Sequence, residues 1–167
     1  GAKQKADMEI LSSDPKNPAL KYFLMVTLAV RAEGSLFTAP NIPAWYAGLN
    51  HPAIAPPNWV FAPVWTTLYV LMAVAAWRVW KITGFKSIEM LAFAVQLALN
   101  FAWSGIFFGL HQIGPALGEI ILLDLAILYA LLLFWRRDRL AGALMLPYLA
   151  WTLFATLLTR AFWLLNP

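Results

Sequence analysis

The sequence predicts an all-α integral membrane protein, built as a bundle of five transmembrane helices. Of the residues, 62% are hydrophobic and 12% are charged, and the mean hydropathy is +0.68. A soluble domain carries about 25% charged residues, so this chain has too little polar surface to cover its core in water. In addition, apolar stretches of about 20 residues, the length of a membrane-spanning helix, occur five times.

The expected spans follow a polar N-terminal tail at 1–18 and form one transmembrane domain at 19–167. They cover 19–38, 59–80, 88–110, 115–135 and 141–165. Three of the connections are short, which predicts that consecutive helices pack as antiparallel neighbours. The exception is an outer loop at 39–58, rich in Pro, Asn and Trp. Loops of that length in a compact fold are usually functional.

Lysine and arginine collect on one side of the expected membrane. Ten of the twelve lie in the tail, at the start of the first span, or around the second and fourth connections: Lys3, Lys5, Lys16, Lys21, Arg78, Lys81, Lys86, Arg136, Arg137 and Arg139. The positive-inside rule then predicts a cytoplasmic N-terminus and an outer-side loop. We therefore expect a multi-pass protein of a bacterial membrane, in contact with lipid.

Several function classes find no support in the residues. The chain has no cysteine, and its only histidines, His51 and His111, lie on outer-side loops without metal-ligand spacing. We expect no metal site, no required cofactor and no standard enzyme motif. The basic residues flank apolar segments instead of forming a surface stripe, which argues against nucleic acid as a partner.

Four ionisable residues interrupt the expected spans, where charge is costly. They are Arg31, Glu33, Asp124 and Arg160, all in the outer third of the bilayer, and their charges sum to zero. Two interpretations are open. They form an inward-facing ion-pair network beneath the outer loop, or each side chain reaches to the nearby headgroups.

The third span carries two patterns. Gln96 and Asn100 lie four residues apart, hence on one helix face, with Trp103 and Phe107 near it. Amides in a membrane helix either bond to another helix or line a site. Another face carries small residues four apart, namely Ala94, Ala98 and Ala102, and the small residue Gly105 follows them. This spacing favours close packing of helices, either within the bundle or in a homodimer.

Four stretches carry a resemblance to a known family. GSLFTAPNIPAWYAGLNHPAIAPPNWVFAPVWTTLYVLM at 34–72 holds Trp45-Tyr46, a proline series and Trp65; QLALNFAWSGIFFG, GEIILLDLAIL and LPYLAWTLFAT follow at 96–109, 118–128 and 146–156. With these motifs the chain resembles the translocator protein family, also called tryptophan-rich sensory protein, TspO/MBR or peripheral-type benzodiazepine receptor.

The resemblance implies a receptor or binding protein for flat hydrophobic ligands, namely porphyrins such as protoporphyrin IX or haem, and sterols. It implies a pocket among the helices beneath the outer loop and a homodimer through the third helix. The residues expected to bind the ligand are Trp45, Trp59, Trp65, Tyr69, Gln96, Asn100, Trp103, Phe107, Tyr148, Trp151 and Ala155. Within them, Trp65 and Trp151 match positions implicated in light-dependent porphyrin breakdown.

Two other functions remain open, a transporter of porphyrin or lipid and an enzyme that degrades porphyrin photo-oxidatively through Trp65 and Trp151. The chain also departs from the family pattern at its four intramembrane ionisable residues.

The proline-rich loop predicts a stiff lid over the bundle or a segment resting on headgroups, with Trp45 turned inward and Tyr46 or His51 outward. Pro63 is expected in the first turns of the second helix, where proline is tolerated.

Overall fold

A computed structural model of the chain describes Ala2 and residues 19–166, without the side chains of 32–44 and Asn58. Within that part it has five long α-helices: α2 (Ala19–Ala44), α3 (Phe61–Thr83), α4 (Ile88–Ser104), α5 (Ile113–Arg137) and α6 (Arg139–Leu165). The 3-10 turns η1 (Tyr46–Gly48) and η2 (Asn58–Val60) lie in the outer loop, and the π-helical turn η3 (Gly105–Gly109) extends α4. Apart from Ala2, the predicted tail at 1–18 lies outside the described residues.

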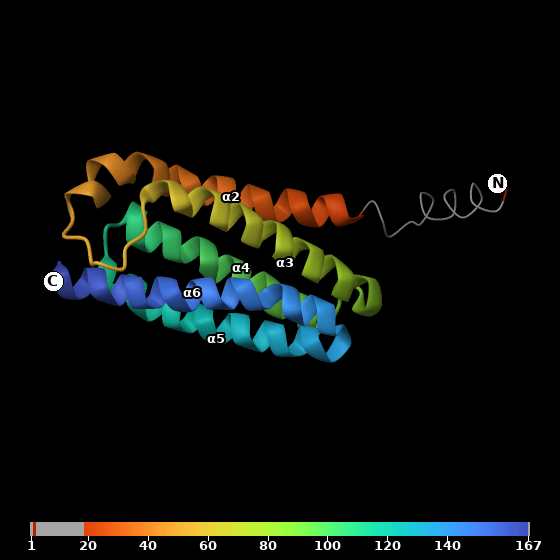
Figure 1. Ribbon diagram of the computed structural model, residues 1–167. Coiled ribbons are helices and arrows are strands. Elements are labelled where there is room, and N and C mark those ends of the chain that lie inside the picture. Colours follow the sequence, from red (N-terminus) through yellow and green to blue (C-terminus); the bar gives the residue numbers. More distant parts are fainter. Residues whose placement is uncertain (1, 3–18, 167) are drawn as a thin grey trace.

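The helices lie side by side, with consecutive helices antiparallel, as expected (Figure 1). The outer loop, the α4–α5 connection and the C-terminal end of α6 share one end of the bundle, which we call the loop end. The α3–α4 and α5–α6 turns and the start of α2 share the other, which we call the basic end because Arg78, Lys81, Arg137 and their neighbours lie there. At this end Gly142 approaches Trp135 so closely that a Cβ would lie 2.8 Å from the Trp135 Cα.

The described helices confirm the membrane class. Four of them are long and apolar enough to cross a membrane, counting η3 with α4: Phe61–Thr83, Ile88–Gly109, Ile113–Arg137 and Arg139–Leu165. Their outer faces expose large apolar side chains such as Leu125 and Leu157, each 60% exposed. Such a surface suits lipid and not water.

The first helix is longer than its sequence suggested. We expected it to end at residue 38, but α2 continues to Ala44, so the outer loop begins at Trp45 and not at residue 39. Pro40 and Pro43 do not stop the helix, because each removes only one backbone donor near its end and has a helix-compatible φ. Pro63 is the third residue of α3, as predicted, where its missing N–H has no intrahelical acceptor anyway.

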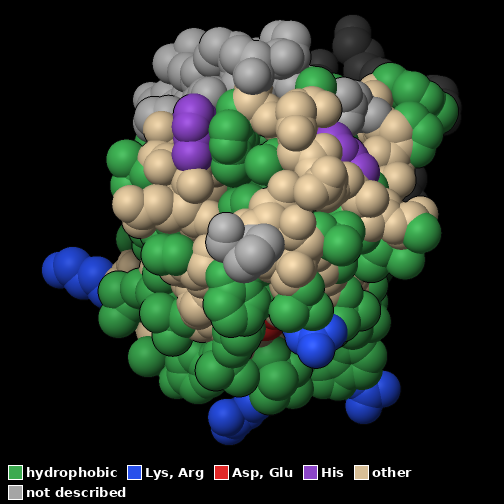
Figure 2. Space-filling view, turned by 90° about the vertical axis from the view of Figure 1, so that its left-hand side faces the viewer, with side chains coloured by type: hydrophobic (Ala, Val, Ile, Leu, Met, Phe, Trp, Pro, Cys, Tyr) green, Lys and Arg blue, Asp and Glu red, His purple; other side chains and the backbone are tan. Residues whose placement is uncertain are grey.

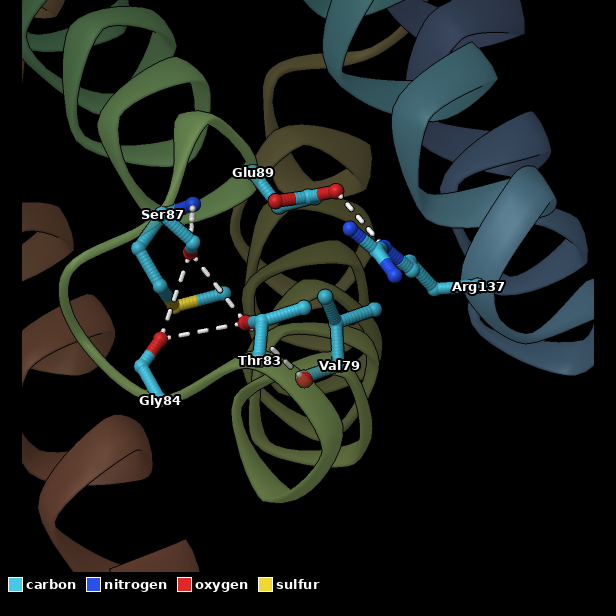
Figure 3. Close-up of polar contacts among 7 residues, drawn as sticks. Val79, Thr83, Gly84, Ser87, Glu89 and Arg137 are labelled. Atoms are coloured by element: carbon cyan, nitrogen blue, oxygen red, sulfur yellow. Dashed lines mark hydrogen bonds and ion pairs between the residues drawn. The ribbon is translucent and has the colours of Figure 1, made fainter.

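Local chemistry sets the helix ends at the basic end. Gly84 ends α3 with φ +73°, a left-handed conformation that favours glycine. Ser87 caps α4, since its Oγ accepts the Met90 N–H at 3.2 Å (Figure 3). Asp138 caps α6 in the same way, through the Leu140 N–H. These caps position the charged residues of this end.

Candidate ligand-binding site

Four buried polar side chains form a hydrogen-bonded chain across the bundle. The Tyr69 hydroxyl donates to the Asn100 Oδ1, the Asn100 Nδ2 donates to the Tyr148 hydroxyl at 2.8 Å, and that hydroxyl donates to the Gln96 Oε1 at 2.7 Å. All four side chains are at most 5% exposed. The two amides of the third span therefore join α3, α4 and α6, as their interhelical interpretation predicts. We call these residues the polar floor.

An aromatic group lies next to the polar floor, on its loop-end side. Trp65 of α3 and Trp151 of α6 meet edge to face, with ring centroids 6.3 Å apart and an interplanar angle of 89°. Trp65 also contacts Tyr69 of the polar floor, and Phe61 packs edge-on against Trp151. The Nε1 of Trp151 is buried without a hydrogen-bond partner. The structure thus brings together two of the tryptophans that the resemblance singled out.

A second aromatic group joins the outer loop to η3 and α6. Trp45 stacks on His111 with centroids 4.3 Å apart and meets the edge of Phe107. Tyr46 is 3% exposed and packs against Phe162. Burial raises the pKa of Tyr46 to about 12, so its hydroxyl stays neutral at physiological pH.

The outer loop covers the bundle end, which favours the lid interpretation. Of the two residues proposed to point outward, His51 is exposed, but Tyr46 is the deeply buried one. Figure 2 looks onto the loop end, where both histidines appear at the surface among apolar side chains. Trp103 stacks on Phe107 of the second aromatic group at 5.3 Å and also packs against the main core. Its Nε1 is buried without a hydrogen-bond partner.

The ion-pair network, one of the two interpretations left open for the intramembrane charges, does not form among the described side chains. Asp124 accepts a hydrogen bond from the Thr156 hydroxyl, Arg31 donates a long bond to the Ala62 carbonyl at 3.5 Å, and Arg160 is exposed. Glu33 lies outside the described side chains. The reason is rotation about α6: Thr156 and the buried Thr159 face inward, and the next residue is turned by about 100° toward the surface.

Further polar atoms in the membrane part of the bundle are buried without a partner in the described chain. They are the Arg31 Nε, the Asp124 Oδ1 and both carboxyl oxygens of Glu119, in addition to the indole nitrogens of Trp103 and Trp151. Unpaired polar atoms are costly where no bulk water reaches them.

The remaining expected site residues lie at different depths. Trp59 is 74% exposed and does not join either aromatic group, whereas Ala155 is buried on α6. Sequence reasoning missed Phe61 and Phe154, which contact Trp151. Phe61 lies four residues before Trp65, and Phe154 lies three residues after Trp151, so the helical spacing could have placed each on the same face as its tryptophan. It also missed Thr156, whose role depends on the rotation of α6 against α5.

Comparison with known proteins agrees with this architecture. The model of the TspO/MBR family matches residues 23–164. The chain belongs to the TspO/MBR family. The match runs from the first described helix to the end of α6, so it covers all five helices and the outer loop.

Named TspO/MBR relatives are similar over most of their length. The chain is 41% identical over 145 residues to the tryptophan-rich protein TspO of Archaeoglobus fulgidus, covering 86% of this chain and 94% of that protein. It is 40% identical over 153 residues to the translocator protein of Homo sapiens, with 89% and 90% covered. It is 38% identical over 149 residues to protein CrtK of Rhodobacter capsulatus, with 87% and 91% covered.

Proposed function

We propose that this chain is a membrane binding protein for flat hydrophobic molecules, with porphyrins such as protoporphyrin IX or haem as the first class and sterols as the second. The observation that carries the proposal is the perpendicular pair of Trp65 and Trp151 beside the polar floor. Because the two rings are perpendicular, a flat ring system can stack on the face of one and meet the edge of the other, and the unpartnered Trp151 N–H supplies a polar point.

Arg31 favours a porphyrin over a sterol. Its guanidinium reaches the carbonyl of Ala62, three residues before Trp65 on α3, and its Nε is buried without a partner in the described chain. Protoporphyrin IX and haem carry carboxylates that would pair with a guanidinium, whereas a sterol has only a hydroxyl. In this proposal Arg31 holds the carboxylate edge of the ligand, and haem is a ligand instead of a resident cofactor.

The test is a titration of the purified protein in detergent with protoporphyrin IX and, in parallel, cholesterol. Porphyrin binding is followed by the shift of the porphyrin absorption band, which does not depend on tryptophan emission. Trp65→Phe and Trp151→Phe should each weaken porphyrin binding about three- to tenfold, because a smaller ring loses stacking area and the indole N–H is gone. Trp135→Phe is the matched control, since Trp135 lies at the basic end.

Arg31→Gln separates the two ligand classes. It should weaken protoporphyrin IX binding and leave cholesterol binding unchanged. Equal porphyrin affinity in the wild type, Trp65→Phe and Trp151→Phe would reject the proposed site, even if the protein bound porphyrin elsewhere. A loss at Trp65 and Trp151 without any effect of Arg31→Gln would keep the site and reject only the carboxylate contact.

Transport and photodegradation are the other functions to distinguish. Illuminating the porphyrin complex and following porphyrin absorbance tests degradation, and turnover that persists in both tryptophan variants would exclude Trp65 and Trp151 from that chemistry. Porphyrin movement across proteoliposomes tests transport, which the name of the mammalian relatives, translocator protein, suggests.

A further inference from the structure

A hollow of ≈ 270 Å³ opens at the basic end, away from the candidate ligand site. It is lined by Arg78, Lys81, Ile82, Arg137 and Asp138. The first three lie on one face of α3, near its C-terminal end, and the last two form the α5–α6 turn. The hollow thus lies between the C-terminal end of α3 and the α5–α6 turn.

The lining carries an excess of positive charge. Asp138 is the only acidic residue among the lining residues, against three cations. It pairs with the Nε of Arg78, and the Nε of Arg137 donates to the buried Glu89 at 2.8 Å (Figure 3). Both carboxylates therefore engage an Nε, and each guanidinium has four further N–H donors on its terminal nitrogens. Even with Glu89 counted, the charges around the hollow do not balance.

The third cation is held at the depth where aromatic residues mark the membrane surface. The Lys81 ammonium lies 3.7 Å from the centre of the Trp77 ring, a cation–π contact. Tryptophan is enriched at the level of the lipid headgroups. The lining residues of α3 lie within five residues of its end at Thr83, and Arg137 is the last residue of α5. The hollow therefore lies at the ends of the spans and not within them.

One wall of the hollow is apolar and open. Ile82, the apolar residue of the lining, is 56% exposed. A soluble anion gains nothing from such a wall, because apolar surface offers it neither charge nor hydrogen bonds. A phospholipid uses both parts, since its phosphate meets the cations while its acyl chains cover the apolar side chains.

We propose that this hollow binds the phosphate headgroup of an anionic phospholipid at the basic end of the bundle. Arg78, Lys81 and Arg137 contact the headgroup, and Ile82 contacts the first part of an acyl chain. This end is the one that the positive-inside rule places in the cytoplasm, where basic pockets between transmembrane helices meet anionic lipids. The proposal does not depend on the ligand of the tryptophan site.

The experiment measures lipid binding to the purified, delipidated protein in neutral detergent by native mass spectrometry. The probes are dioleoyl phosphatidylglycerol, dioleoyl phosphatidylcholine and inorganic phosphate. We expect phosphatidylglycerol to bind more tightly than phosphatidylcholine, and inorganic phosphate at millimolar concentration not to displace it. Lys81→Gln should weaken phosphatidylglycerol binding about fivefold, the usual effect of one basic residue near anionic lipid.

The matched control is Lys86→Gln, which removes the same charge at the same end but outside the hollow. It should change the affinity less than twofold. Arg78→Lys keeps the charge beside Asp138, so the fold is retained, but loses the planar fork and should weaken binding about threefold. Equal binding of the two lipids, equal effects of Lys81→Gln and Lys86→Gln, or displacement by inorganic phosphate would each overturn the proposal.

Discussion

Asn50 and Asn166 exchange backbone and side-chain hydrogen bonds between the outer loop and the end of α6. The Asn50 N–H donates to the Asn166 Oδ1 at 3.0 Å, and the Asn166 Nδ2 donates to the Asn50 carbonyl at 3.0 Å. A third bond joins the Asn50 Nδ2 to the Leu165 carbonyl at 3.3 Å. The loop is thus tied to a helix end 116 residues away in sequence.

Asn166→Ala should loosen the outer loop without unfolding the bundle. It removes the two hydrogen bonds that join the Asn166 side chain to the loop, together with its bond to the Phe162 carbonyl, so the free energy of loop opening should fall by about 1 kcal/mol. Hydrogen exchange of the backbone amides in 46–55 should become faster, while that of α3 stays the same. Asn50→Ala keeps the backbone bonds to Asn166 and removes only the Nδ2 bond to the Leu165 carbonyl, so it should loosen the loop less than Asn166→Ala does. An equal or larger effect of Asn50→Ala would show that the Asn166 side chain is not what holds the loop.

Tyr148→Phe should destabilise the core. The variant leaves the Asn100 Nδ2 without its acceptor and the Gln96 Oε1 without its donor, in a buried position. We expect a loss of about 1–3 kcal/mol in the free energy of unfolding, measured by denaturation in detergent. Tyr129→Phe is the matched control, since Tyr129 is 52% exposed on α5 and should tolerate the change.

Arg137→Gln should destabilise the protein in neutral detergent because it leaves the Glu89 carboxylate, 4% exposed, without its ion-pair partner (Figure 3). Arg137 is half-exposed, so we expect a loss of about 2 kcal/mol, below that for a fully buried pair. The double variant with Glu89→Gln should recover most of the stability. Arg136→Gln, at the exposed neighbouring position, should hardly change the free energy of unfolding. If it lowered the stability as much as Arg137→Gln does, the cause would be the change in net charge and not the lost ion pair.

Asp138 should make the stability of the fold depend on acid pH. The hydrogen bond from Arg78 holds the pKa of Asp138 below its usual range. A carboxyl group with a lowered pKa in the folded state stabilises the fold above its unfolded pKa of about 3.9, and this contribution is lost as the pH falls through the folded pKa. Asp138→Asn keeps a helix-capping side chain. Its unfolding midpoint should therefore vary less between pH 5 and 2 than that of the wild type.

Ala98→Trp should shift the protein from dimer to monomer if the small-residue face of α4 forms a dimer. Ala94 and Ala98 are both exposed there, so a second copy could approach the backbone closely. The mass of the detergent-solubilised protein, measured by light scattering, decides this. Ala150→Trp, at an exposed alanine of α6, is the control. An unchanged mass in Ala98→Trp would place any dimer contact elsewhere.

Patterns along the sequence were enough to predict the helices and much of the candidate site. Apolar runs located the spans, because the cost of burying charge in lipid is a property of each segment. Helical spacing placed Gln96 and Asn100 on one face, and the resemblance pointed to Trp65 and Trp151. The end of α2 was misplaced because two prolines near a helix end weaken it without stopping it.

The sequence by itself determined the membrane class, the five long helices and the family. Only the tertiary structure decided which side chains meet: Tyr148 with Asn100, Asp124 with Thr156, and Asn50 with Asn166. These partners lie 48, 32 and 116 residues apart. Their contacts depend on the rotation of each helix about its axis, and a turn of one residue exposes Arg160 while its neighbour Thr159 is buried. Hydropathy is summed along the chain, whereas these pairings exist only once the helices have packed.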